Sequence, residues 1–127
     1  MTKEEIDELK KSDADGLRIY EYIANSIGQG DDTDLQPLAE ALRDVDITGQ
    51  FTASAARFIN AIDAVRYADV VRLLVAATID RDRDRAFLGD LMQSIYGPDH
   101  MDRARELCES DNNFRRMYKR LHNSDPM

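Results

Sequence analysis

The sequence predicts an all-α fold: a compact single-domain bundle (residues 1–127) of about six to eight short helices. Apolar residues recur at steps of three and four along nearly the whole chain, which is the period of an amphipathic helix. No segment alternates apolar and polar residues between two turns, so no sheet is expected. The stripes are mostly too short for a long parallel bundle, and we therefore expect large crossing angles between helices.

Start and stop signals in the first part of the chain separate three helices. Thr2 and Glu5 have the spacing of a capping box, in which each side chain binds a free N–H group of the first turn. Gly28 and Gly30 end the second helix because glycine tolerates a left-handed cap. Asp34 is placed to cap the third helix.

Similar signals divide the remainder of the chain. Gly49 is expected to end the third segment and Thr52 to begin the next one. Gly97, which proline follows, is the strongest stop signal. Ser110 or Asp111 caps the last helix. The sequence lacks the patterns of known helical-repeat families, so we do not expect a repeat of that kind.

The central helix is predicted at about residues 69–79. Arg72 is the only charged residue between Val70 and Ile79, and a helix that is apolar around most of its circumference is buried on most sides. The other stripes are expected to pack around it. The pattern leaves open whether residues 53–79 form one helix or two helices with a break near residues 66–69.

The net charge of −8 comes from the first fifty residues. Residues 1–50 contain thirteen acidic and five basic side chains, whereas residues 51–127 contain twelve of each. A charge asymmetry of this kind influences association with other molecules more than it influences the fold.

We therefore expect a non-catalytic protein–protein interaction module of adaptor, inhibitor or immunity type. Its acidic N-terminal face would bind another protein, and the partner is expected to be basic or nucleic-acid-binding. No direct binding to nucleic acid and no membrane contact are expected. The expected contact residues all carry carboxylates: Glu4, Glu5, Glu8, Asp13, Asp15, Glu21, Asp31 and Asp32. Tyr20 and Tyr22, two positions apart on a helix, cannot both face the core, so one is expected to be an exposed contact anchor.

The composition suggests a cytoplasmic protein. The N-terminus is too charged for a signal peptide, and the longest apolar run is far shorter than a membrane-spanning helix needs. The single cysteine, Cys108, cannot form an internal disulfide and is typical of a reducing compartment.

The first alternative is a divalent-cation site in a degenerate pair of EF-hand-like loops. Two aspartate-rich stretches begin at Asp44 and Asp80, and they place oxygen ligands at alternate positions as calcium loops do. The position of the bidentate glutamate is occupied by Ala55 and Leu91, and arginines alternate with the second set of aspartates. We therefore expect no metal site.

The second alternative comes from Arg116 and His122, which have five residues between them. This spacing resembles the R-x4–6-H motif of HEPN-type ribonucleases, and the resemblance implies a helical nuclease in which both side chains act on the scissile phosphate. The same segment carries Arg115, Lys119 and Arg120 without an acid. We expect these cations to have an intramolecular role that faces the acidic N-terminal half.

Conventional catalytic signatures are missing from the sequence. It has no H-E-x-x-H, no G-x-S-x-G, no phosphate-binding glycine loop and no dinucleotide fingerprint. We therefore expect that the protein is not an enzyme, that it has no catalytic residues and that it needs no cofactor.

Overall fold

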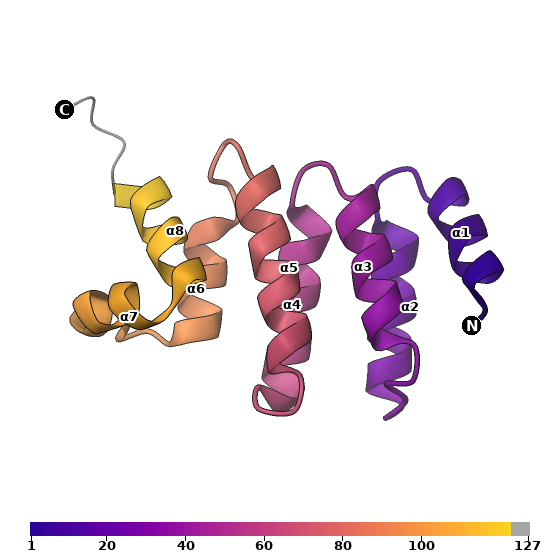
Figure 1. Ribbon diagram of the computed structural model, residues 1–127, viewed down its shortest axis with the longest axis horizontal. Helices are drawn as coiled ribbons and strands as arrows, with labels where there is room; N and C mark the ends of the chain where they lie inside the picture. Colours follow the sequence, from indigo (N-terminus) through magenta and orange to yellow (C-terminus); the bar gives the residue numbers. More distant parts are fainter. Residues whose placement is uncertain (123–127) are drawn as a thin grey trace.

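The computed structural model describes residues 1–122, and all of its regular elements are helical (Figure 1). They follow one another as α1 (Lys3–Ser12), α2 (Leu17–Gly28), α3 (Leu35–Val45), α4 (Gln50–Asp63), α5 (Ala68–Arg81), α6 (Leu88–Tyr96), the 3-10 helix η1 (His100–Arg103), α7 (Ala104–Ser110) and α8 (Asn112–His122). The predicted all-α fold is thus confirmed. None of the helices within residues 1–122 is long and apolar enough to cross a membrane.

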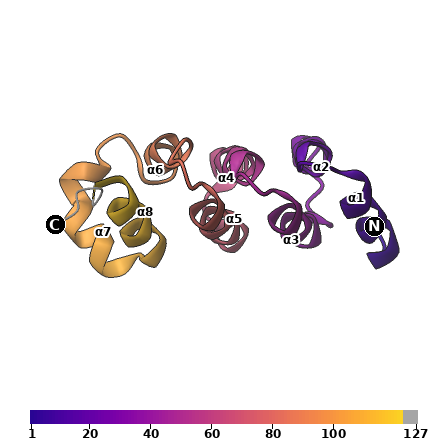
Figure 2. The same cartoon turned by 90° about the horizontal axis from the view of Figure 1, so that it is seen from above.

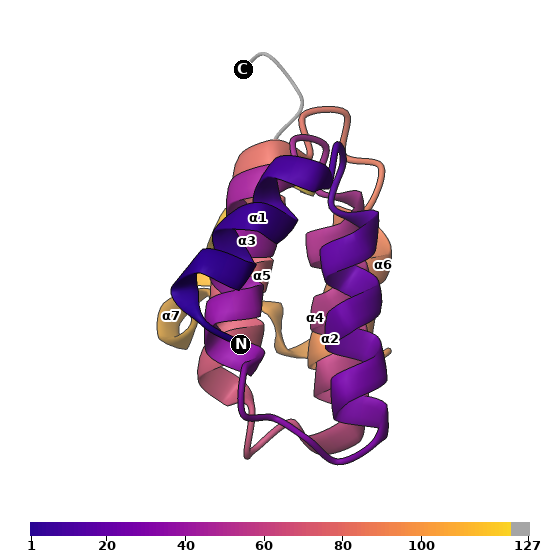
Figure 3. The same cartoon turned by 90° about the vertical axis from the view of Figure 1, so that its right-hand side faces the viewer.

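The helices stand side by side in two layers. Seen from above, one layer contains α2, α4 and α6, and the other contains α1, α3, α5 and α8 (Figure 2). The layers face each other when the stack is viewed from its N-terminal end (Figure 3). The axes of α2 to α5 run nearly parallel in Figure 1, so the expected large crossing angles are wrong for these helices. Short turns join antiparallel neighbours, and each hairpin packs against the next one.

The predicted central helix is α5, which contacts α3, α4, α6 and α8. Leu74 and Val75 on α5 are buried, as is Ile59 on the facing side of α4. The open question about residues 53–79 is settled as two helices, because the chain turns at residues 64–67 between α4 and α5. Apolar burial along this hairpin stabilises the fold, since each fully buried aliphatic side chain contributes about 1.5–3 kcal/mol.

A recurring turn precedes α2, α4 and α6, the three helices of one layer. Asp13, Asp46 and Asp82 are buried, and each precedes α2, α4 or α6 by a few residues. In each case Oδ2 accepts a hydrogen bond from the N–H group six residues later, at 2.9, 2.8 and 3.0 Å respectively. The carboxylates therefore satisfy N–H groups of the first helical turn that have no partner within the helix.

The third residue after each of these aspartates has a left-handed backbone. Gly16 has a φ of 105° and Gly49 a φ of 88°, whereas the third turn has Arg85 at 58°. Gly49 thus precedes α4 as its N-cap, and the helix begins two residues before the predicted start at Thr52.

The other predicted boundaries are mostly correct. The capping box of Thr2 and Glu5 is present, and α2 ends at Gly28. Gly97 follows the last residue of α6, and the carboxylate of Asp111 accepts the N–H group of Phe114 in the last helix. Asp34 precedes α3 but makes no side-chain cap, because its carboxylate binds the N-terminus instead.

Candidate functional site in the groove between α1 and α2

A groove of about 520 Å³ runs between α1 and α2 at the N-terminal end of the stack. Carboxylates, apolar groups and an arginine line it: Met1, Glu4, Glu5, Glu8, Leu9, Ser12, Arg18 and Tyr22. Because α1 is the outermost helix of its layer, no other described helix covers its outer side (Figure 3). The groove is therefore open to a partner.

Two large exposed apolar residues line this groove. Tyr22 exposes 45% of its surface and Met1 40%. Tyr20 instead packs against the core, with its ring centroid 6.1 Å from that of Phe51. The prediction that one of the two tyrosines is exposed is confirmed, and Tyr22 is that residue.

The first turn of α1 holds Glu5 in a defined position. The Thr2 side chain accepts the N–H group of Glu5 at 3.1 Å, and the Glu5 carboxylate accepts the N–H group of Thr2 at 2.9 Å. The hydrogen bond from the Thr2 backbone lowers the pKa of Glu5 below its ordinary value. Glu5 therefore carries a full negative charge at neutral pH.

Glu4 and Glu8 lie one turn apart on α1, and both are exposed. Lys11 approaches Glu8 at 3.9 Å, but both side chains are more than three-quarters exposed. An exposed pair at this distance contributes little energy. These two carboxylates remain available to a partner's cations.

The N-terminal amino group ties the start of α1 to the start of α3. The Met1 nitrogen lies 2.9 Å from Oδ1 of Asp34, and this hydrogen bond is the main reason that the pKa of the amino group is raised. Sequence reasoning missed both Met1 and Arg18 as groove residues. No local pattern marks them, because their place depends on how α1 packs against α2 and α3.

Asp13 does not belong to the exposed acidic set. Its carboxylate accepts N–H groups of Gly16 and Ile19 at 3.0 and 2.9 Å, and only 5% of the residue is exposed. The carboxylate of Asp13 therefore stabilises the start of α2.

The remaining predicted acids do not form one continuous face. Asp15 precedes α2 and accepts the N–H group of Leu17 at 3.0 Å, whereas Asp31 and Asp32 follow the same helix. A helix of twelve residues is about 18 Å long, so these groups lie at opposite ends of α2. Glu21 is exposed on α2 itself.

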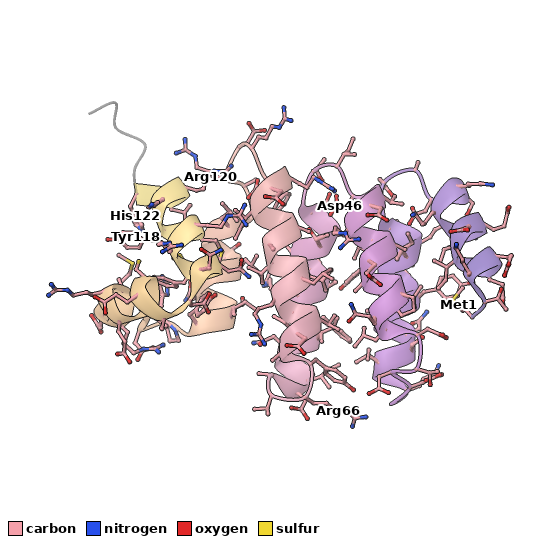
Figure 4. The ribbon with its side chains drawn as sticks, viewed as in Figure 1. Met1, Asp46, Arg66, Tyr118, Arg120 and His122 are labelled. Carbon is pink, nitrogen blue, oxygen red and sulfur yellow. The ribbon has the colours of Figure 1, made fainter. Side chains whose placement is uncertain are left out.

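Two of the acids after α2 have partners within the protein. Asp31 accepts the N–H group of Thr33 at 3.0 Å, and this bond lowers the pKa of the carboxyl. Asp32 binds Arg66 at 2.7 Å and the Tyr67 hydroxyl at 3.0 Å. Arg66 lies at the lower end of the stack in Figure 4, far from α1. Among the predicted contacts, the structure brings together Glu4, Glu5 and Glu8.

In the two aspartate-rich stretches that resemble EF-hand loops, the buried aspartates stabilise the starts of α4 and α6. The carboxylate of Asp46 accepts N–H groups of Thr48, Gly49, Phe51 and Thr52, and that of Asp82 accepts those of Ala86, Phe87 and Leu88 (Figure 4 shows Asp46).

The first aspartates of the two stretches form ion pairs. Asp44 lies 3.0 Å from Lys10 and 3.3 Å from Arg43, and Asp80 lies 2.5 Å from Arg116. Partial burial on its own raises the pKa of Asp44, but the hydrogen bonds from Lys10 and Arg43 leave it below the ordinary value. Within residues 1–122 there is no group of three or more His, Cys, Asp or Glu side chains arranged to hold a metal ion.

Arg116 and His122, the HEPN-like pair, both lie on α8. Arg116 is the ion-pair partner of Asp80, and the His122 ring lies 4.6 Å from the Tyr118 ring (Figure 4). Arg116 and Arg120 have partners within the protein, as expected for the α8 cations. The expectation that these cations face the acidic N-terminal half is wrong. Their partners belong to α5 and the turn after it, because α8 lies at the opposite end of the stack from α1.

Comparison with known proteins gave no match to a family model, a curated protein or a solved structure. Function is therefore inferred from the chain's own residues and geometry.

Proposed function

We propose that this protein is a non-catalytic protein-binding module, of adaptor, inhibitor or immunity type, whose N-terminal groove binds a basic partner protein. The observation that carries the proposal is the meeting of two kinds of side chain in one groove. Glu4, Glu5 and Glu8 supply negative charge, and the half-exposed ring of Tyr22 supplies a large apolar contact.

The two kinds of side chain support binding in different ways. Exposed carboxylates attract a basic surface at long range and therefore raise the rate of association. A tyrosine at the centre of a contact loses its water on binding and commonly contributes a large share of the affinity. Glu4 and Glu8 point to the same side of α1, so they act on the same part of a partner.

The groove also restricts the chemistry of the partner. Arg18 lines it and, within the part of the chain that the structure describes, donates only one long hydrogen bond, to Oγ of Ser12 at 3.4 Å. A suitable partner therefore offers lysines or arginines around an apolar centre, with one hydrogen-bond acceptor that reaches Arg18. The groove is present without a partner bound, and a preformed surface lowers the entropic cost of binding.

The test uses the intact chain to capture a partner from lysate, followed by kinetics with the purified partner. Glu4→Lys with Glu8→Lys is the informative variant, because it leaves the capping box of Glu5 in place. Its matched control is Glu106→Lys with Glu109→Lys, which makes the same change of charge on exposed positions of α7. We expect association to slow about tenfold in the first variant and to stay within about twofold in the control.

Two further measurements complete the test: the salt dependence of association and the effect of replacing Tyr22. Raising NaCl from about 50 mM to about 300 mM should slow association of the wild type more than that of the Glu4, Glu8 variant. Tyr22→Ala should weaken binding by at least about tenfold, mainly through faster dissociation. A partner that ignores salt, the charge reversal and Tyr22→Ala would overturn the proposal.

A further inference from the structure

A second cleft lies between α8, the C-terminal end of α5 and the turn that leads to α6. Its volume is about 560 Å³, and five of its six lining residues are cationic: Ile79, Arg83, Arg85, Arg116, Lys119 and Arg120. None of the lining residues is acidic. This concentration of positive charge contrasts with the protein as a whole, whose net charge is −8.

Two elements bring these cations together. Arg116, Lys119 and Arg120 stand three and four positions apart, so they lie on one side of α8. Arg83 and Arg85 belong to the turn that follows α5. The first group was visible in the sequence as an acid-free stretch, but its meeting with the second depends on the packing of α8 against α5.

Some of the cations build the wall of the cleft. Arg120 donates to the carbonyl oxygens of Ile79 and Asp82, both at 2.6 Å, and this fixes α8 to the end of α5 (Figure 4). Arg116 is held by Asp80 at 2.5 Å. These contacts keep the cleft in shape without a ligand.

The other three cations of the cleft have hydrogen-bond donors that are available to a ligand. Arg85 gives one N–H group of its guanidinium to the carbonyl oxygen of Arg120 at 3.2 Å, which leaves the rest of the group free to bind. Within residues 1–122, no hydrogen bond or ion pair is found for the side chains of Arg83 and Lys119. Three cations thus converge on a cleft that contains no carboxylate among its lining residues.

The backbone of Arg85 also distinguishes this turn from the two earlier ones. Glycine occupies the same left-handed position in the two earlier turns, at Gly16 and Gly49, but the third turn has an arginine there, with a φ of 58°. An L-residue in this conformation costs stability. The third turn also differs from the others at its second position, where Arg83 stands in place of Ala14 and Ile47. The two changes place both of the turn's arginines in the cleft.

We propose that this cleft binds the phosphate groups of a small phosphorylated molecule of about diphosphate size. Arginine forks bind the oxygens of a phosphate in pairs, and several cations around one cleft match a multiply charged anion better than a single carboxylate. The volume suits a small ligand. The cations are confined to one cleft and do not form the extended track that a nucleic-acid backbone requires. This site is separate from the N-terminal groove and does not depend on its function.

The test is calorimetric titration of the full chain with inorganic pyrophosphate, with NaCl used to keep the ionic strength constant. We expect saturable binding to one site. Arg83→Gln with Lys119→Gln removes two cations that have no partner among residues 1–122, and it should weaken binding at least about tenfold. Arg57→Gln with Arg105→Gln removes the same charge from exposed positions outside the cleft, and it should change the affinity less than about twofold.

Arg85→Gly separates binding from folding. It should weaken pyrophosphate binding without lowering the melting temperature, because glycine suits the left-handed turn. The proposal would be overturned by the absence of saturable binding up to about 10 mM pyrophosphate, or by an equal loss in the control variant. It would also be overturned if a single-stranded RNA oligonucleotide bound more than about tenfold more tightly than pyrophosphate and lost that binding in the Arg83, Lys119 variant.

Discussion

Asp46 and Asp82 occupy the same position in two successive turns of the stack. Each carboxylate is buried, and its Oδ2 atom accepts the N–H group six residues later, at 2.8 Å in the first turn and 3.0 Å in the second. The backbone carbonyls of both residues are bound in the same way, by Arg81 and by Arg120, each at 2.6 Å. Each of these aspartates therefore connects the end of one helix to the start of the next helix and to an arginine of a later helix.

The first prediction concerns the carboxylate of Asp46. Asp46→Ala should lower the free energy of unfolding by about 2–4 kcal/mol, because several buried N–H groups lose their acceptor. Asp44→Ala is the control, since Asp44 is exposed and forms ion pairs with Lys10 and Arg43. It should cost less than about 1 kcal/mol. Urea unfolding measures both values, and equal costs would show that the turn is not held by Asp46.

The second prediction concerns Thr52 and Thr78. Their Oγ1 atoms lie 2.8 Å apart and are fully buried between α4 and α5. Each single change to Val should cost about 1 kcal/mol, because it removes the hydrogen bond between the two hydroxyls, while the remaining hydroxyl keeps the carbonyl oxygen of Gly49 or Leu74 as its acceptor. The double variant should cost clearly less than the sum of the two, and a double-mutant cycle checks this. Additive costs would show that the two hydroxyls are not coupled.

The third prediction compares the third residue of two turns. Arg85→Gly should raise the free energy of unfolding by up to about 1 kcal/mol, since it relieves a left-handed arginine. Gly49→Ala should lower it by about 1–2 kcal/mol, because φ there is 88°. Thermal and urea unfolding give both values. A stability loss for Arg85→Gly would mean that the arginine contributes more through its contacts than its backbone costs.

The fourth prediction tests the central helix. Leu74 is fully buried on α5, so Leu74→Ala should cost about 2–5 kcal/mol through lost apolar burial and a residual cavity. Leu73, its neighbour, is only partly buried, and Leu73→Ala should cost clearly less. A similar cost at both positions would contradict the arrangement of α5 within the stack.

The fifth prediction concerns calcium. Millimolar calcium should leave the melting temperature unchanged, because the oxygens of Asp46 and Asp82 already accept backbone N–H groups. Differential scanning fluorimetry measures the shift. A saturable rise in melting temperature that disappears in Asp80→Asn with Asp82→Asn would favour the cation-binding alternative.

Local patterns were sufficient to predict most of the helices. The capping box of Thr2 and Glu5, the stop at Gly97 and the apolar run of α5 each depend on interactions within a few residues. The same patterns misassigned the aspartates. Asp44 and Asp80 matched a calcium loop, while the repeated turn begins two residues later, at Asp46 and Asp82. Burial distinguishes the two pairs, and burial depends on packing between distant segments.

The candidate sites were predicted less completely than the helices. The acidity of residues 1–50 pointed to the N-terminal end, and Glu4, Glu5 and Glu8 do line one groove. Asp13 does not belong to that set, because its carboxylate accepts N–H groups at the start of α2. The basic cleft was missed because Arg85 and Lys119 are far apart in the sequence and meet only when α8 packs against α5.

The sequence by itself determined the helical periods, their ends and the uneven distribution of charge, because these follow from neighbouring residues and from composition. Only the tertiary structure decided that the helices form two layers, that three aspartates play one repeated role, and that five cations share a cleft. The aspartates of successive turns, and the two groups of cations in the cleft, are each more than thirty positions apart. These relationships depend on which helix faces bury each other, and no local pattern specifies that choice.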